Sequence, residues 1–140
     1  MNMVIPDQGK LLWLNWMLPS DGSDQENFSV RLFQNNITPD ADSVLGDFTI
    51  ATFTGYASVP VDRSDFGGTF ISAHVAYSDS AVVPTYTCTG GSAQTVYGWY
   101  MVATISNVVV AAQRFDSPRS MAPGATEALD PFTMALQTLH

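Results

Sequence analysis

Residues 95–116, TVYGWYMVATISNVVVAAQRFD, decide the fold class of this chain. They contain two apolar runs, 95–103 and 108–115, separated by the short polar segment 104–107. Both runs are rich in β-branched and aromatic residues, which favour a pleated and half-buried strand. A connection of this length is typical of a hairpin loop. We therefore expect the stretch to form the central antiparallel hairpin of a β domain.

The composition indicates one domain with a substantial core, because 46% of the 140 residues are hydrophobic and only 13% are charged. The formal net charge is −8, which argues against nucleic-acid binding, since that requires clustered cations. The low charge content has two interpretations. Either other subunits cover part of the surface, or serine, threonine, asparagine and glutamine supply its polarity.

A helix is predicted over residues 6–18, after an N-terminal arm formed by residues 1–6. Pro6 suits a first helical position, and Asp7 lies in the first turn, where the helix dipole favours an anion. Apolar residues surround most of this helix, so we expect it to be buried on most sides. Trp13 and Trp16 share one face, which either closes one end of the β domain or anchors a partner.

Alternating apolar residues predict the remaining strands, and proline, glycine and polar clusters predict the turns between them. A short turn or helix is expected at 44–48, and residues 116–124, DSPRSMAPG, are predicted to form an extended loop. The pattern predicts a mainly β fold, an antiparallel β-sandwich or jelly roll with one short N-terminal helix, over residues 1–140 as a single domain. The further predicted strands are 28–33, 56–61, 69–77, 82–89 and 132–139.

No residue pattern in the chain indicates catalysis. Cys88 is the single cysteine, so no intrachain disulfide can form, and it is expected to be a small buried hydrophobe. His74 is expected to be structural, because no nucleophile motif accompanies it. Asp40 and Asp42 lack the glycine and glutamate that complete a calcium loop, so we expect turn carboxylates there. We therefore predict that the chain is not an enzyme and has no catalytic residue, cofactor or metal.

No targeting or membrane segment is predicted. Residues 1–10, MNMVIPDQGK, lack a basic region followed by a long apolar run, and no apolar window is long enough to span a bilayer. We expect the chain to be synthesised in a cytoplasm and either to remain there or to leave within an assembly.

The aromatic residues allow two interpretations. Such residues can form a sugar-stacking platform, but in alternating strands they more often pack in the core or pair across strands. The residues concerned are Tyr56, Tyr77, Tyr86, Tyr97, Trp99 and Tyr100.

Two segments of the chain carry a recognisable pattern. In the first, L-[FY]-x-N-x-x-T-P matches residues 32–39 and [DE]-[FY]-T-x-A-x-F-x-G-Y matches 47–56. In the second, V-Y-G-[WY]-[YF] matches residues 96–100 and A-x-R-F matches 112–115. This pattern resembles small proteins encoded beside the structural genes of tailed bacteriophages and found in marine viral sequences. The resemblance covers about 40% of the chain.

The resemblance implies a non-catalytic virion structural protein. A capsid decoration or cement subunit is the first expectation, and a minor tail or adhesion protein acting as a carbohydrate-binding module is the alternative. The expected partners are other virion proteins, above all the major capsid protein, and further copies of the chain, with a trimer favoured. Neither nucleic acid nor membrane is an expected partner.

We expect inter-subunit contacts in residues 1–6 and 116–124. The second segment has little side-chain volume for a core of its own, and its prolines reduce the cost of ordering it on a neighbour. Chain ends likewise gain order when a partner holds them. The predicted contact residues are Met3, Ile5, Trp13, Trp16, Pro118, Arg119 and Met121.

Overall fold

The protein, seen in a computed structural model that describes residues 3–17, 26–72, 75–130 and 133–137, is mainly β and antiparallel. One α-helix, α1 (Asp7–Met17), precedes the strands, and short 3₁₀ turns occur at Leu45–Asp47 and Arg63–Asp65. The predicted fold class is therefore confirmed. The strands of the described residues are β1 (Phe28–Phe33), β2 (Val59–Val61), β3 (Phe66–Ser72), β4 (Val75–Ser80), β5 (Thr85–Thr87), β6 (Gln94–Ala103), β7 (Val109–Met121), β8 (Thr126–Ala128) and β9 (Thr133–Gln137).

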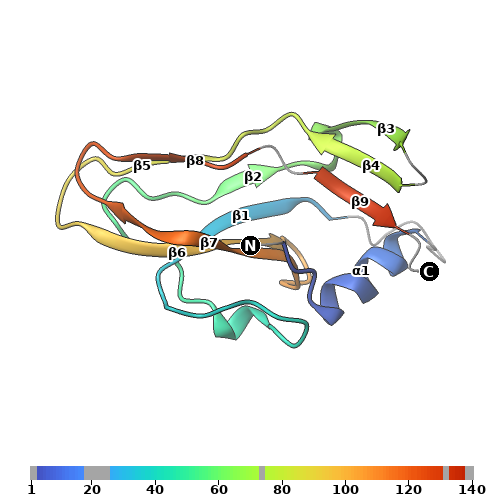
Figure 1. Cartoon of the computed structure of the whole chain (residues 1–140), viewed down its shortest axis with the longest axis horizontal. Helices are drawn as coiled ribbons and strands as arrows, with labels where there is room; N and C mark the ends of the chain where they lie inside the picture. The colour runs from blue at the N-terminus through green and yellow to red at the C-terminus, as the bar shows by residue number, and fades with distance from the viewer. Residues whose placement is uncertain (1–2, 18–25, 73–74, 131–132, 138–140) are drawn as a thin grey trace.

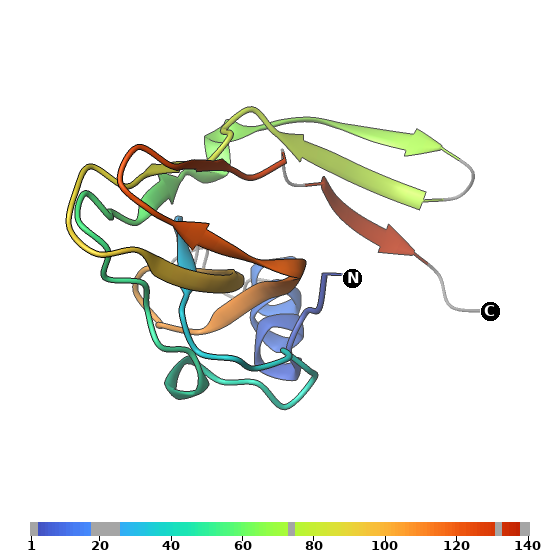
Figure 2. The ribbon, with the colours of Figure 1, turned by 60° about the vertical axis from the view of Figure 1, so that its left-hand side comes forward.

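These strands form two layers (Figures 1 and 2). One layer is the sheet with strand order β2-β1-β6-β7. The other contains the sheet β3-β4-β9 and the strand pair β5-β8. Figure 2 shows the second layer above the first, with β3, β4 and β9 extending beyond it. Helix α1 lies against the first layer, on the side of β7.

Most of both layers comes from a single antiparallel ribbon that is folded over. β4 pairs with β9, β5 with β8, and β6 with β7, so the pairing is nested around the hairpin loop. The fold in the ribbon lies at residues 88–93 on one strand and 122–125 on the other. There the N–H of Cys88 donates to the carbonyl of Ala125 and the N–H of Gly124 donates to that of Cys88, at 2.9 and 2.8 Å. These bonds continue the ladder through the bend.

The central hairpin is confirmed. Ala103 and Val108 close its loop through a 2.9 Å backbone hydrogen bond. Asn107 has a φ of 59°, a left-handed conformation that asparagine tolerates better than most residues. The carboxylate of Glu26, which is buried, accepts hydrogen bonds from the backbone N–H groups of Ile105 and Ser106. The segment that precedes β1 therefore holds the tip of the β6–β7 hairpin.

A large bulge separates two parts of β7. Val96 is paired with Arg119, whereas Gly98 is paired with Arg114. One β6 residue therefore faces four β7 residues, 115–118, and the extra residues project from the ladder. The prediction of an extended loop at 116–124 is thus wrong up to Met121, which belongs to β7. Only residues 122–124 form a turn, with Gly124 at a φ of 88°.

Both faces of the first layer are buried. One face packs with the second layer around Val30, Met101 and Tyr86. The other face is covered by residues 34–50, where Phe48 stacks on Tyr100 with ring centroids 4.6 Å apart. Burial on both sides explains why residues 98–103 form one continuous apolar run and do not alternate with polar residues.

The N-terminal segment is held on the edge of β7. Val4 and Ala112 exchange backbone hydrogen bonds of 2.7 and 2.9 Å. Helix α1 then lies close to β7, since a Cβ added to Gly9 would stand 2.7 Å from the carbonyl oxygen of Val109. The predicted helix is confirmed, but it is less buried than expected, because 61% of Leu11 is exposed.

Other strand predictions need correction. The single strand expected at 69–77 is a hairpin, in which β3 ends at Ser72 and β4 begins at Val75. His74 lies outside the described residues. The strand expected at 82–89 is reduced to β5, and the one expected at 56–61 is reduced to β2. The short turn or helix predicted at 44–48 is confirmed, as the 3₁₀ turn Leu45–Asp47.

Gly98 is predicted to be the position of the sheet least tolerant of a side chain. A Cβ there would lie 2.2 Å from the carbonyl oxygen of Gln113 and 2.6 Å from the Phe33 ring. Gly98→Ala should therefore lower the free energy of unfolding by about 1–3 kcal/mol or more, as overpacking does. Gly46→Ala is the matched control, because its Cβ would meet nothing within 4 Å. Equal urea midpoints for the two variants would contradict the prediction.

Tyr86 is predicted to make stability fall at alkaline pH. Burial, followed by the neighbouring Tyr56 and Tyr100, raises the pKa of Tyr86 well above its ordinary value of about 10. Above pH 10 the unfolded chain loses this proton while the folded chain keeps it, so the free energy of unfolding decreases as pH rises. Urea titrations from pH 8 to 11 should show this decrease, and Tyr86→Phe should flatten it. If the free energy of unfolding of Tyr86→Phe falls with pH as steeply as that of the wild type, groups other than Tyr86 cause the loss of stability at alkaline pH.

Candidate docking groove

A groove lies between β7 and residues 127–130, the segment that begins within β8. Its volume is about 510 Å³. Trp99 and Leu129, each only 5% exposed, and Phe115 contribute apolar atoms to the lining, but most of its accessible surface is polar. The full lining is Met3, Trp99, Gln113, Phe115, Asp116, Arg119, Glu127, Ala128, Leu129 and Asp130.

The groove follows directly from the bulge in β7. Arg119 rejoins the ladder opposite Val96, which places the exposed residues between Phe115 and Arg119 at the rim. The chain then turns at 122–125 and returns as β8, which provides Glu127 and Ala128 to the opposite wall. Segments that are adjacent along the ribbon thus form both walls.

Arg119 reaches from one wall of the groove toward the other. Its guanidinium carbon lies 5.7 Å from the centroid of the Phe115 ring, a cation–π distance. Its Nε is 3.7 Å from Oε1 of Glu127, too far for a hydrogen bond but within ion-pair range. The Arg119 side chain is 51% exposed and that of Glu127 is 19% exposed. Such a pair is worth little stability in water.

The structure separates the predicted contact residues into distinct groups. Met3 and Arg119 come together as lining residues of the groove, and Pro118 is exposed in the adjoining bulge. Ile5 is half-buried in the segment beside β7.

Two predicted contact residues have core roles. Met121 is 1% exposed and belongs to the core, so it is not available to a partner. Trp13 packs on Phe28 with ring centroids 5.6 Å apart, which matches the interpretation of the helix as a cover for the β domain. The side chain of Trp16 lies outside the described residues.

Seven lining residues were not among the predicted contacts: Trp99, Gln113, Phe115, Glu127, Ala128, Leu129 and Asp130. Trp99 was considered for sugar stacking, and Trp99 and Phe115 belong to the resemblance pattern, but neither was predicted to line a groove. Glu127 and Asp130 lie in a segment with no motif. Only the register of the folded ribbon brings them together, and no local signal encodes that register.

A second, shallower cleft lies near the fold in the ribbon, and its polar side chains already bind one another. Oε1 of Gln94 accepts hydrogen bonds from the N–H groups of Thr52 and Phe53, at 2.8 and 3.2 Å. Nε2 of Gln94 donates to Thr52 Oγ1 and to Oε1 of Gln34. This amide therefore attaches residues 52–53 to the start of β6. The cleft is lined by Gln34, Thr52, Phe53, Thr54, Ser92, Ala93, Gln94, Thr95 and Tyr97.

The aromatic residues considered for a sugar platform are largely in the core. Tyr86, Trp99 and Tyr100 are at most 5% exposed. The hydroxyl of Tyr86 donates to the carbonyl of Val30 at 2.8 Å, and the Tyr86 ring stacks on Tyr56. The side chain of Tyr77 is outside the described part of the chain. The platform interpretation therefore lacks Tyr86, Trp99 and Tyr100, three of its six residues.

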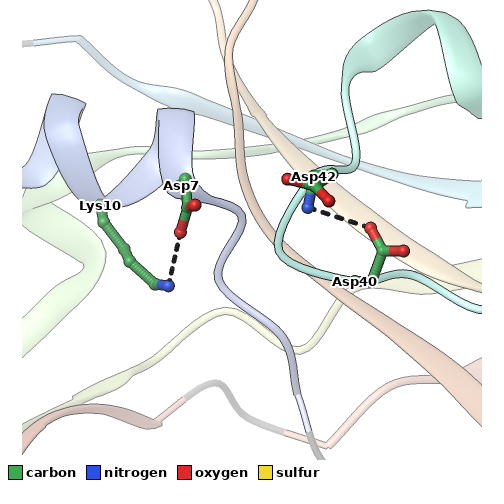
Figure 3. A network of polar contacts seen from close by, with 4 residues as sticks. All are labelled: Asp7, Lys10, Asp40 and Asp42. Carbon is green, nitrogen blue, oxygen red and sulfur yellow. Dashed lines mark hydrogen bonds and ion pairs between the residues drawn. The ribbon is translucent and has the colours of Figure 1, made fainter.

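The other positions examined for chemistry have structural roles. Cys88 is buried, and its Sγ donates to the carbonyl of Gly90 at 3.3 Å. Asp40 accepts hydrogen bonds from the Asp42 N–H and the Ser43 hydroxyl at 3.0 Å, so it shapes a turn beside the start of α1 (Figure 3). Lys10 pairs with Asp7 in the helix nearby. Across the described residues there is no cluster of three or more His, Cys, Asp or Glu that could hold a metal.

Within the same residues, no helix has the length and apolarity needed to cross a bilayer. Comparison with known proteins adds no assignment: no protein-family description matches the chain, and no curated protein sequence matches it.

Alanine substitutions of Gln94 in the cleft and of Arg119 in the groove are predicted to lower the free energy of unfolding by different amounts. Gln94→Ala leaves the N–H groups of Thr52 and Phe53 without their acceptor and should cost about 1–3 kcal/mol. Arg119→Ala removes only an exposed ion pair and should cost less than about 1 kcal/mol. Urea unfolding of both variants checks this order. A larger loss for Arg119→Ala would mean that the groove depends on this side chain for its shape.

Proposed function

We propose that the chain is a non-catalytic structural subunit of a tailed-phage virion, a capsid decoration or cement protein that docks on neighbouring virion proteins through the groove. The observation that supports this is the groove itself, whose mainly polar lining combines the charged Asp116, Arg119, Glu127 and Asp130 with small exposed parts of Trp99, Phe115 and Leu129. Interfaces likewise combine charged or polar groups with apolar ones. The sequence resemblance supplies the virion context.

The distribution of aromatic side chains supports a structural subunit over a carbohydrate-binding module. A module that stacks sugars needs several rings exposed on one face, whereas Tyr86, Trp99 and Tyr100 stabilise the core. The neutral polar cleft does not replace such a platform, because Gln34 and Gln94 already use their amides within the molecule.

The exposed alanines provide a matched test of this function. Ala128 lines the groove, whereas Ala81 is exposed after β4 and does not line it. Ala128→Trp would fill part of the groove with a large ring, and Ala81→Trp adds the same ring elsewhere. The assay is sedimentation of purified chain with phage heads that were produced without its gene.

We expect wild-type chain and Ala81→Trp to co-sediment with the heads, and Ala128→Trp to bind at least about tenfold more weakly. Tenfold corresponds to about 1.4 kcal/mol, which is within the range for one interface residue. Thermal melts should show that both variants stay folded. Absence of wild-type binding to any head or tail particle would overturn the proposal, and equal binding by the two tryptophan variants would remove the groove from it.

A further inference from the structure

The strand edges of this molecule differ in their protection against pairing with another chain. In the first layer, β2 is three residues long and contains Pro60, while β7 has a bulge and is paired with Val4. In the second layer, β5 and β8 have three residues each, and the pairing of β3 with β4 shifts register between Phe66 and Thr69. Short length, proline and bulges are usual protections of an edge. Each of these edges therefore has at least one of them.

The outer edge of β9 lacks these protections. β9 consists of residues 133–137, TMALQ, which are uncharged and include no proline. It pairs with β4 in one continuous register from Thr133 to Gln137, without a bulge. Within the described part of the chain, β4 is its only hydrogen-bonded neighbour, and Figures 1 and 2 show β9 at the margin of the sheet β3-β4-β9. The other edge of β9 therefore offers backbone N–H and C=O groups to an additional strand.

The charge of this sheet indicates which kind of strand fits there. Asp79 is the single charged residue in the sequences of β3, β4 and β9, although the whole chain has a formal net charge of −8. A basic segment of another protein would find no carboxylate on β9. Two copies of this acidic chain, in contrast, would bring no like charges together at this edge, where opposed like charges are destabilising. The edge therefore favours an uncharged strand, and β9 of a second copy is such a strand.

An antiparallel pair of β9 strands is also self-complementary. In a twofold arrangement centred on Ala135, this residue stands opposite its own copy. Met134 then stands opposite Leu136 of the second copy, and Thr133 stands opposite Gln137. Apolar residues thus meet apolar ones and polar residues meet polar ones, which is the favourable type of cross-strand pair.

The same pairing continues an apolar row of the sheet from one chain into the other. Register places Ile71, Ala76 and Leu136 in one row across β3, β4 and β9. In the twofold pair, Met134 of the second copy is the next member of this row. Register is most strongly specified where such rows are apolar, because a slip by one residue exchanges the two faces of the sheet.

We propose that two copies of the chain associate through β9 and form one continuous antiparallel sheet, in the order β3-β4-β9-β9-β4-β3. A twofold contact closes at two chains, so it yields a dimer and not the trimer expected from the sequence resemblance. The inference is independent of the proposed function, because it uses neither the groove nor any virion protein. The paired strands have five residues each, a small interface, so we expect a Kd of about 10–100 μM.

Sedimentation equilibrium of the purified chain measures this association. Between about 5 and 500 μM, a range that brackets the expected Kd, the average mass should rise from 15.1 kDa toward twice that value. Ala135→Lys should weaken association at least about tenfold, because two lysines would stand opposite each other on the axis. Ala81→Lys is the matched control, since Ala81 is exposed and lies outside β9. It should associate as the wild type does.

Variants of opposite charge test the twofold register. Ala135→Glu should be as weakly associated as Ala135→Lys, because each places like charges opposite each other. An equimolar mixture of the two should associate about as strongly as the wild type, since lysine then stands opposite glutamate. A variant that merely unfolds the sheet would not be rescued by mixing. In the wild type, amide hydrogen exchange measured by NMR should slow at alternate residues of 133–137 as concentration rises.

The proposal is supported by a dimer whose association is lost in both Ala135 variants and restored in their mixture. It is overturned by a wild type that stays monomeric at the highest concentration, by a trimer, by an equal loss in Ala81→Lys, or by absence of rescue. If the Ala135 variants do not fold, the hydrogen exchange of the wild type decides, and slowing confined to residues outside 133–137 overturns the proposal. Sedimentation with phage heads is a separate measurement, so failure of the proposed function leaves the β9 contact intact, and the reverse also holds.

Discussion

The structure depends on one constraint: a single antiparallel ribbon keeps its pairing while it bends from one layer into the other. The bend is short on both strands, and its ladder continues through the two hydrogen bonds between Cys88 and residues 124–125. Because the strands on either side of the bend are partners in both layers, neither layer can form its register independently. Tyr86 connects the layers further, since its hydroxyl is bound to the carbonyl of Val30 across the core.

The bulge in β7 is the position where this ribbon accommodates its own curvature. Bulges increase the local twist of a strand and occur where a sheet bends or ends. Here the extra residues also change the surface, because they carry Pro118 and the charges around it to an edge of the sheet. Prolines, charges and bulges are the usual protection of an edge against uncontrolled pairing. The edge of β7 is thus protected, whereas the groove beside β8 remains accessible.

Sequence reasoning succeeded where the signal is local. The central hairpin, α1 and the short 3₁₀ segment each have their determinants within a few neighbouring residues. It failed at 69–77, where residues 72–75 are Ser-Ala-His-Val and include no glycine, proline, asparagine or aspartate to indicate the hairpin. It also failed at 116–121, where the two prolines and the glycine of residues 116–124 indicated a loop. Proline is tolerated at a bulge, and pairing with the distant residues 94–96 keeps the segment in β7.

The residues that carry the sequence resemblance have structural roles. Asn35 bonds the backbone of Asp47 and Thr49, and so closes the segment that covers one face of the first layer. Arg114 lies over Tyr97 and binds the carbonyl of Ile37 and the side chain of Asn36, both at 2.6 Å. These contacts join the two matching segments to each other.

The candidate groove, in contrast, takes its β8 wall from outside both segments of the pattern. The matching residues define a scaffold whose ribbon must bend at 88–93 and 122–125, and the bend brings Glu127 and Asp130 opposite the bulge. Glu127 and Asp130 determine the charge of this wall, whereas Leu129 between them belongs to the core. The groove and the core therefore share Trp99 and Leu129, and only the charged positions can change without altering the packing of the core.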